Sequence, residues 1–280
     1  MKAKIRRVAA AAAVFVAAAG AQAQLQENRI VIDGSTTVGP IGKAFAEHFM
    51  RENRGVNVVV SESGSGNGAR GIVNNTIDVG MMSRFMTAAE FRASAEREVR
   101  PVAHAVALDG LPVLVHPSNP VGNLTLDQVR DIYAGRIRNW REVGGPNLEI
   151  VFVSRDTNSG TYETFNTVVM RGTEIAAAAE YVGSNGAVRQ RVQTTPAAIG
   201  YAGLGFVDET VKALQINGVT PSERTIVSGR YPIARALYMF TNGYPEMGTL
   251  LYRFMTLHLT PEGEEIVKSI GFVPVTHYGF

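Results

Sequence analysis

The sequence predicts an α/β protein built from two lobes. Three observations lead to this prediction: short apolar runs rich in β-branched residues alternate with helical patterns, several of these pairs are joined by polar loops rich in Gly and Ser, and the alternation starts again in the second half of the chain. Strands that alternate with helices favour a mainly parallel sheet in each lobe.

The first lobe is expected to alternate between strand and helix. The helical pattern is clearest where apolar side chains from Val38 to Phe49 recur at three- and four-residue spacing, which indicates one buried face. In chain order, the sequence predicts a strand over 29–32, a helix over 38–49, a strand over 56–60, a helix over 69–75 and a strand over 77–80.

The second lobe is expected to follow a stretch of strand-forming residues over 102–115, which is interrupted at Asp109-Gly110. Thr125 is typical of a helix N-cap and favours a helix over 126–133. The remaining expected elements are a strand over 148–153, a helix over 162–170, strands over 198–206 and 236–240, and closing helices over 245–257 and 261–270.

Composition and charge exclude several classes of protein. The 280 residues carry 27 Lys+Arg and 25 Asp+Glu, and a net charge of +2 is too weak to indicate a nucleic-acid partner. The absence of cysteine excludes a disulfide framework, a thiolate metal site and a cysteine nucleophile. The five histidines stand apart in the sequence, so we expect neither a zinc site nor any other cofactor.

The first 23 residues predict a cleavable secretory signal peptide. Four basic residues precede an apolar run over 8–19, and the segment closes on Ala21-Gln22-Ala23. The run is about a dozen residues, shorter than the ~20 of a membrane span. The alternative, an amphipathic N-terminal helix, is disfavoured because the run is apolar all round.

Cleavage after Ala23 would remove four basic and no acidic residues, leaving an exported chain with a formal charge of about −2. No cysteine stands at the cleavage point, so we do not expect a lipoprotein. The expected location is therefore the periplasm.

Three loops share one design, in which hydroxyls and glycines follow a strand and precede a helix. A helix N-terminus presents unpaired N–H groups and a partial positive charge, so such loops can bind an oxyanion. Ordinary helix capping by Ser or Thr is the alternative for each loop, and both interpretations remain open at this point. The candidates for binding are Ser35, Thr36, Thr37, Ser65, Ser159, Gly160 and Thr161.

Two arginines support the oxyanion hypothesis, because they could supply positive charge beside these loops. Arg84 follows Ser83 just after one predicted strand, and Arg155 follows Ser154 just after another. Ligands of open α/β sheets bind at the carboxyl ends of strands, and the planar guanidinium suits phosphate or carboxylate. A solvated surface position is the alternative for either arginine.

Two catalytic or nucleotide motifs carry little weight in this sequence. Residues 66–71 fit G-x-G-x-x-G, but they follow the second predicted strand of a chain expected to be exported, where a dinucleotide site is not expected. No serine stands in G-x-S-x-G, so a nucleophile elbow is not predicted.

The loops, taken in order and spacing, resemble the periplasmic phosphate-binding proteins of ABC phosphate transporters. The resemblance covers nearly the whole chain after residue 23. The motifs that carry it are Asp33-Gly-Ser-Thr-Thr, Ser63-Gly-Ser-Gly-Asn-Gly, Asp78-Val-Gly-Met-Met-Ser-Arg, Ala107-Leu-Asp-Gly, Gly135-Arg-Ile-Arg-Asn-Trp, Ser154-Arg-Asp-Thr-Asn-Ser-Gly-Thr, Ile199-Gly-Tyr and Tyr231-Pro-Ile-Ala-Arg.

This resemblance implies a two-lobed type II periplasmic binding protein fold with the ligand cleft between the lobes. The chain would cross between lobes by hinge strands near 108–111 and 231–235, giving a first lobe of 24–108 plus 236–280 and a second lobe of 109–235. The implied function is a non-catalytic, monomeric receptor that captures inorganic phosphate and delivers it to an ABC permease. Carried over by match, the site comprises Thr36, Thr37, Ser65, Ser83 and Arg84 from the first lobe and Arg155, Ser159, Gly160 and Thr161 from the second.

Two positions depart from the family pattern. Ser83 and Thr157 stand where well-known members carry Asp, a residue that can accept a proton from phosphate but only repels sulfate. Asp109 and Asp156 are left as possible substitutes. We therefore expect phosphate binding with weaker selectivity against sulfate. The alternatives are a receptor for sulfate, molybdate or a phosphate ester, an exported phosphohydrolase, and a secreted adhesion or signalling protein.

Overall fold

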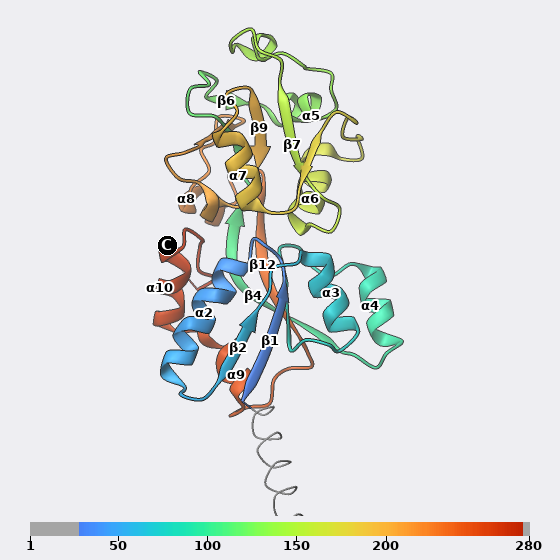
Figure 1. The fold of residues 1–280 in the computed structure, drawn as a ribbon, viewed down its shortest axis with the longest axis vertical. Helices are drawn as coiled ribbons and strands as arrows, with labels where there is room; N and C mark the ends of the chain where they lie inside the picture. The colour runs from blue at the N-terminus through green and yellow to red at the C-terminus, as the bar shows by residue number, and fades with distance from the viewer. Residues whose placement is uncertain (1–27, 277–280) are drawn as a thin grey trace, which may run out of the picture.

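The computed structural model describes residues 28–276, so the predicted signal peptide and its cleavage site lie outside the described residues. Two five-stranded sheets, each with its own helices, form two lobes stacked along the long axis of the molecule (Figure 1). The first sheet has the order β2 (Asn57–Val60), β1 (Arg29–Gly34), β3 (Val79–Met82), β12 (Ala234–Asn242) and β4 (Pro101–Gly110). The second has the order β10 (Lys212–Ala213), β5 (Val113–Val115), β9 (Ala198–Tyr201), β7 (Val151–Arg155) and β8 (Glu180–Val182).

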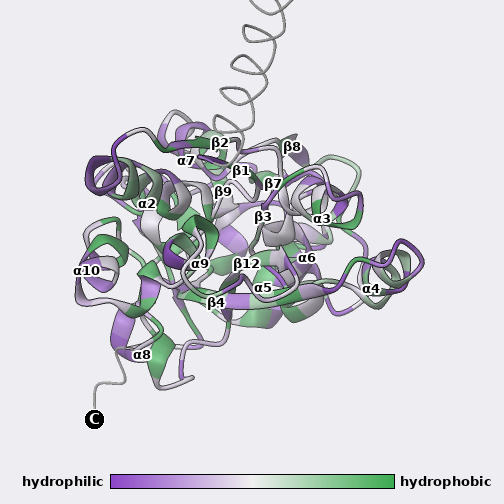
Figure 2. Ribbon diagram, turned by 90° about the horizontal axis from the view of Figure 1, so that it is seen from below, coloured by the Kyte–Doolittle hydropathy of each residue, from purple (hydrophilic) through white to green (hydrophobic). Residues whose placement is uncertain are grey.

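The helices also form two sets, one in each lobe. Figure 2 shows α2, α9 and α10 on one side of the molecule and α3 with α4 on the other. The helices of the first lobe are α2 (Gly39–Glu52), α3 (Ser65–Val73), α4 (Ala88–Ala95), α9 (Leu250–Met255) and α10 (Pro261–Ser269). Those of the second are α5 (Leu126–Tyr133), α6 (Gly160–Phe165), α7 (Asn185–Gln193) and α8 (Glu223–Val227), beside a short pair of strands, β6 (Asn123–Leu124) and β11 (Gln215–Ile216).

Each lobe has its own hydrophobic core. In the first, α2 buries the apolar face that the sequence predicts, and Phe49 packs edge-on against Phe254 of α9 at 5.4 Å between ring centroids. In the second, Phe165 stacks on Tyr201 at 3.9 Å, and the buried Tyr133 hydroxyl donates to the Val153 carbonyl at 3.0 Å. The prediction of two separately packed α/β lobes is confirmed.

Two long strands connect the lobes. β4 and β12 pair antiparallel over their whole length, with Asp109 opposite Arg235, and the chain passes into the second sheet at β5 just after β4 ends. Figure 1 shows both strands running toward the junction of the lobes. The sheets are therefore mixed rather than purely parallel, because β12 runs antiparallel to β3 and β4, and β5 antiparallel to β9 and β10.

Several predicted boundaries were wrong for local reasons. The helix expected from 245 begins only at Leu250, where the Thr249 hydroxyl accepts from the Tyr252 amide. The strand expected over 198–206 ends at Tyr201, and the helix expected over 162–170 begins earlier, at Gly160, and continues as a π-helix, Asn166–Met170. Within residues 28–276, no helix combines the length and apolar character needed to cross a membrane.

Candidate functional site

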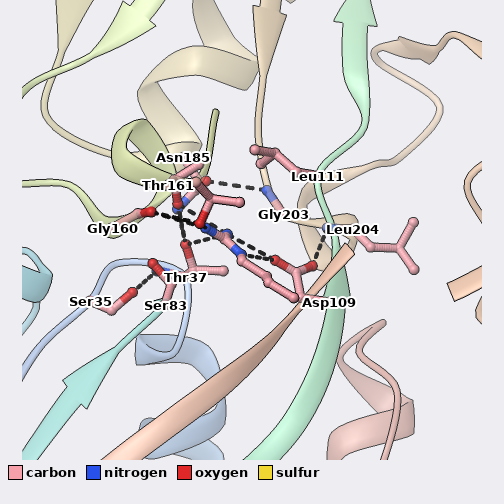
Figure 3. Close-up of polar contacts among 12 residues, drawn as sticks. Ser35, Thr37, Ser83, Asp109, Leu111, Gly160, Thr161, Asn185, Gly203 and Leu204 are labelled. Atoms are coloured by element: carbon pink, nitrogen blue, oxygen red, sulfur yellow. Dashed lines mark hydrogen bonds and ion pairs between the residues drawn. The ribbon is translucent and has the colours of Figure 1, made fainter. Parts of the chain in front are cut away.

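The polar loops converge where the two sheets meet. They follow β1, β2, β7 and β8 and precede α2, α3, α6 and α7, so parallel strands bring their carboxyl ends to the junction of the lobes. Figure 3 shows Thr37, Thr161 and Asn185 close together there, although they come from three different loops. The hydroxyls of Thr37 and Thr161 lie 2.9 Å apart across the junction.

The first loop is shaped by a glycine and by its own serine. Gly34 has φ +137°, and a Cβ there would lie 2.1 Å from the Met81 carbonyl oxygen, so only glycine lets β1 and β3 approach this closely. The Ser35 hydroxyl accepts from the Thr37 amide at 3.1 Å and holds the turn. The Ser35 hydroxyl is thus used within its own loop, whereas the hydroxyls of Thr36 and Thr37 form hydrogen bonds with residues of the second lobe.

The second and third loops meet at Gly160. The hydroxyls of Ser65 and Ser83 lie 3.3 Å apart, and the Ser83 amide donates to Ser65 Oγ at 3.1 Å. Both side chains are buried, and a Cβ at Gly160 would lie 2.5 Å from Ser65 Oγ and 2.8 Å from Ser83 Oγ. Glycine at 160 therefore allows the second-lobe loop to lie directly on this serine pair.

Capping by a hydroxyl is seen most clearly at the third loop. The Ser159 hydroxyl accepts from the Tyr162 amide at 3.3 Å and caps α6. At the start of α2 the N-cap residue Val38 has no side-chain acceptor, but its amide donates to Ser35 Oγ at 3.4 Å. The N-cap residue of α3 is Gly64, which has no side chain that could accept a hydrogen bond.

Arg155 is a buried cation at the junction. Its side chain is 1% exposed; Nε donates to the Val182 carbonyl at 3.1 Å, and Nη2 to the Gly183 carbonyl at 2.8 Å and to Thr36 Oγ1 at 3.3 Å. Nη1 is buried and has no hydrogen-bond partner among residues 28–276. Burial lowers the pKa of Arg155 to about 10, so the guanidinium is still charged at neutral pH.

Arg84, the other predicted clamp, has different surroundings. Nη1 and Nη2 donate to the two carboxylate oxygens of Glu90 at 2.8 and 2.7 Å, and Nε lies 2.6 Å from Oε2 of Glu163. Burial alone would lower the pKa of Arg84, but the contacts with Glu90 and Glu163 outweigh it and raise that pKa. The expectation that Arg84 offers its charge to an anion stays a prediction, and in this structure the guanidinium is paired with the carboxylates of Glu90 and Glu163.

A buried ion pair at the site was not predicted from the sequence. Arg235 of β12 donates through Nε and Nη2 to Oδ2 of Asp109 at 3.0 and 2.9 Å, and through Nη2 to Thr161 Oγ1 at 3.1 Å. Oδ1 of Asp109 accepts from the Leu204 amide at 2.9 Å. Burial raises the pKa of Asp109, and Arg235 partly offsets that rise.

Asp109 and Asp156 were left as possible acceptors of a proton from the ligand, so the partners of their carboxylate oxygens matter. Both carboxylate oxygens of Asp109 are already engaged, by Arg235 and by the Leu204 amide. Asp156 uses Oδ1 to accept from the Asn158 amide at 2.9 Å. Asp109 is therefore held in an ion pair with Arg235, and one oxygen of Asp156 is used within its own loop.

Asn185, at the start of α7, is a further residue that sequence reasoning missed. It is fully buried, and its amide nitrogen lies 3.1 Å from Thr36 Oγ1 and 2.9 Å from Thr37 Oγ1. A signal was present, because residues 183–186 form a fourth Gly-Ser-Asn-Gly loop before a helix, and the Ser184 hydroxyl caps α7.

The second-lobe loop also docks on the first lobe beside the threonines. Nδ2 of Asn158 donates to the Ser63 carbonyl at 2.7 Å, and the Asn158 carbonyl accepts from the Gly66 amide at 3.0 Å. These contacts, with Arg155–Thr36 and Thr37–Thr161, describe two lobes closed against each other. Across residues 28–276, no three His, Asp or Glu side chains are grouped to hold a metal ion.

Comparison with known proteins identifies similar sequences and folds. A family model described as a PBP superfamily domain matches residues 17–260. The chain is 33% identical over 252 residues to the phosphate-binding protein PstS of Bacillus subtilis, covering 88% of this chain and 81% of that protein. It is 29% identical to PstS of Borreliella burgdorferi, covering 90% and 92% of the two chains.

Solved structures show the same similarity. A putative phosphate ABC transporter substrate-binding protein with bound phosphate from Clostridium perfringens superposes with a TM-score of 0.82 at 30% identity, covering 89% of this chain and all of the other. An ABC-type phosphate transport receptor from Vibrio cholerae superposes with a TM-score of 0.71 at 28% identity, covering 87% and 99%. The type II periplasmic binding protein fold expected from the sequence is confirmed.

Proposed function

This chain belongs to the PBP superfamily and, within it, to the PstS phosphate-binding proteins, and on that premise we propose that it binds inorganic phosphate between its two lobes. The observation that carries the proposal is Nη1 of Arg155, a buried guanidinium nitrogen without a hydrogen-bond partner in the described chain. A buried charge left unpaired is costly, and a phosphate oxygen would offset that cost.

The proposed site is the set of groups around Arg155. Arg155 supplies the charge, and the hydroxyls of Thr36, Thr37 and Thr161 lie within one connected set of hydrogen bonds beside it. Ser65, Ser83 and Gly160 form the neighbouring wall. Ser35 and Ser159 act mainly by shaping their loops, and Arg84 is left out of the charge-supplying set because Glu90 and Glu163 balance it.

The function that fits this site is a receptor that closes on its ligand. The lobes are joined by β4 and β12, and closure by a hinge in these strands would bury the anion between Arg155 and the first-lobe loops. We place the lobe boundaries near residues 109 and 235, where Asp109 and Arg235 face each other on the two strands. The protein would then pass phosphate to a membrane ABC permease.

The receptor assignment has two further parts that rest on the family. We propose that the protein acts in the periplasm without catalysis, since its relatives carry the name of binding proteins. Incubation with a phosphomonoester should release no phosphate above the background rate. Metal-stimulated release would favour a phosphohydrolase instead.

Calorimetric titration with phosphate and with sulfate tests the main proposal. Each titration is run at one pH below and one pH above the second ionisation of phosphate. We expect phosphate to bind at both pH values and sulfate to bind measurably, because Ser83 and Thr157 stand where well-known members of the family carry an Asp that repels sulfate. The absence of phosphate binding at either pH would overturn the assignment.

A further inference from the structure

Asn185 has its side-chain amide fixed in one orientation. The Gly203 backbone amide donates to Oδ1 of Asn185 at 3.2 Å. A backbone N–H can only donate, so the amide oxygen must face Gly203 and the NH₂ group must face the threonines (Figure 3). The two amide hydrogens are then used by Thr36 Oγ1 and Thr37 Oγ1.

The hydroxyl oxygen of Thr36 also receives a second donor, since Nη2 of Arg155 lies 3.3 Å from Thr36 Oγ1. A hydroxyl has two lone pairs and one proton. With both lone pairs of Thr36 accepting, its remaining proton has to be donated to another group. Arg235 does not supply the same second donor to Thr37, because the two hydrogens of its Nη2 have nearer acceptors, Asp109 Oδ2 at 2.9 Å and Thr161 Oγ1 at 3.1 Å.

Thr161 extends this ordering to the second lobe. Its hydroxyl lies 2.9 Å from Thr37 Oγ1 and accepts from Arg235 Nη2 at 3.1 Å. Thr37 accepts from Asn185 and Thr161 accepts from Arg235, so whichever hydroxyl of this pair donates to the other, the one that accepts has both lone pairs occupied and must donate its own proton onward. The fixed donors Asn185, Arg155 and Arg235 thus leave two protons to be donated onward, one from Thr36 and one from the Thr37–Thr161 pair.

We infer that Asn185 is a positioning residue that turns these threonine hydroxyls into donors toward the anion. The inference rests on the proposed function and deepens it, because it names what decides the preference of the site. The group formed by Thr36, Thr37 and Thr161 presents two protons to the ligand, one from Thr36 and one from the Thr37–Thr161 pair. It suits an ionised tetrahedral oxyanion, and it does not distinguish a ligand that carries a proton from one that has none.

Two substitutions separate hydroxyl orientation from a purely structural role. Asn185→Leu removes the donor without adding charge and leaves the Gly203 amide without its acceptor. Asn185→Asp keeps the shape and that acceptor, but it replaces the donor with an acceptor that would draw the threonine protons away. We expect phosphate affinity to fall about tenfold in Asn185→Leu and about a hundredfold in Asn185→Asp.

Asn119 supplies the matched control. It is a second buried asparagine of the same lobe, and its hydrogen bonds go to His116, Val121 and Lys212. Asn119→Leu should leave phosphate affinity unchanged. If Asn185→Leu weakened binding more than Asn185→Asp, the role of Asn185 would be structural and the inference would be wrong.

A double-mutant cycle with Thr37→Val tests the route of the effect. Because Asn185 acts through the hydroxyls, Asn185→Leu should cost about threefold or less in the Thr37→Val background, against about tenfold alone. Equal costs in both backgrounds would overturn the inference. If the unsubstituted protein bound no phosphate, the proposed function would fail; if it bound phosphate and both Asn185 variants bound equally well, only the inference would fail.

Discussion

The regions around Arg84 and Arg155 share a local sequence pattern, but the two guanidinium groups have different partners. Each arginine follows a serine at the carboxyl end of a strand beside the cleft, and each side chain is largely buried. Arg84 meets the carboxylates of Glu90 and Glu163, whereas Arg155 meets two backbone carbonyls and a threonine hydroxyl. The same local sequence pattern therefore yields a neutralised cation in one region and an uncompensated one in the other.

The difference comes from groups supplied by other elements. Glu90 belongs to the capping box of α4, where it also accepts from the Thr87 amide, and Glu163 projects from α6 of the other lobe. Within residues 28–276 no carboxylate forms an ion pair with Arg155, although the charge of the neighbouring Asp156 raises the pKa of Arg155 against the effect of burial. A buried charge without a counter-ion is costly to the fold, so its retention fits a position where an anion supplies the missing partner.

The largest expected effect in this comparison is that of Arg155→Met. Methionine keeps much of the buried stem and removes the only charge without a carboxylate partner among the three arginines described above. Phosphate affinity should fall at least tenfold, about 1.4 kcal/mol, with little change in thermal unfolding of the unliganded protein. An unchanged dissociation constant in calorimetry would remove Arg155 from the site.

Gly66→Ala tests whether the loop after Arg155 must dock on the first lobe. A Cβ at Gly66 would lie 2.4 Å from Oδ1 of Asn158, so closure of the lobes should be hindered while α3 itself gains a better helix former. We expect about a fivefold loss of phosphate affinity and no loss of unliganded stability.

Gly186→Ala is the control for this substitution. Gly186 also lies in the first turn of a helix, and the nearest atom to its Cβ would be Ser184 Oγ at 3.9 Å. Its phosphate affinity should match that of the unsubstituted protein. If both alanine variants bound phosphate equally well, the docking of Asn158 would have no part in binding.

Arg84→Met should have the smallest effect of the three. Its charge is already balanced, and the Glu163 side chain is 32% exposed and can be solvated when the arginine is lost. Phosphate affinity should change less than about threefold. A loss as large as that of Arg155→Met would show that the Arg84 charge reaches the anion in spite of its carboxylate partners.

Elements with strong local signals were predicted well. The helix over 126–133 has the expected bounds, because Thr125 and Gln128 form a capping box that fixes its start without help from the rest of the chain. Helices α4, α7 and α8 were not predicted. The helix α7 buries only Val188 and Val192 among its apolar residues, so the pattern that would indicate one buried face is too weak.

The residues of the candidate site likewise include some that the sequence predicted and some that it did not. The hydroxyl and glycine loops were found because their chemistry is contiguous in sequence. Asn185 was missed although residues 183–186 repeat the loop pattern, and Asp109 was considered only as a proton acceptor. The ion pair of Asp109 with Arg235 was not predicted, because it joins residues that are distant in the chain. The pairing of Arg84 with Glu163 was not predicted for the same reason.

Local sequence patterns were enough to predict the α/β class, the order of most strands and helices, and the loops that meet at the cleft, because periodicity, capping and glycine act over a few neighbouring residues. The tertiary contacts were needed to show which arginine is paired with carboxylates and which groups donate to the threonine hydroxyls. These properties depend on burial and on hydrogen-bond partners from distant segments, and both arise only when the two lobes pack against each other.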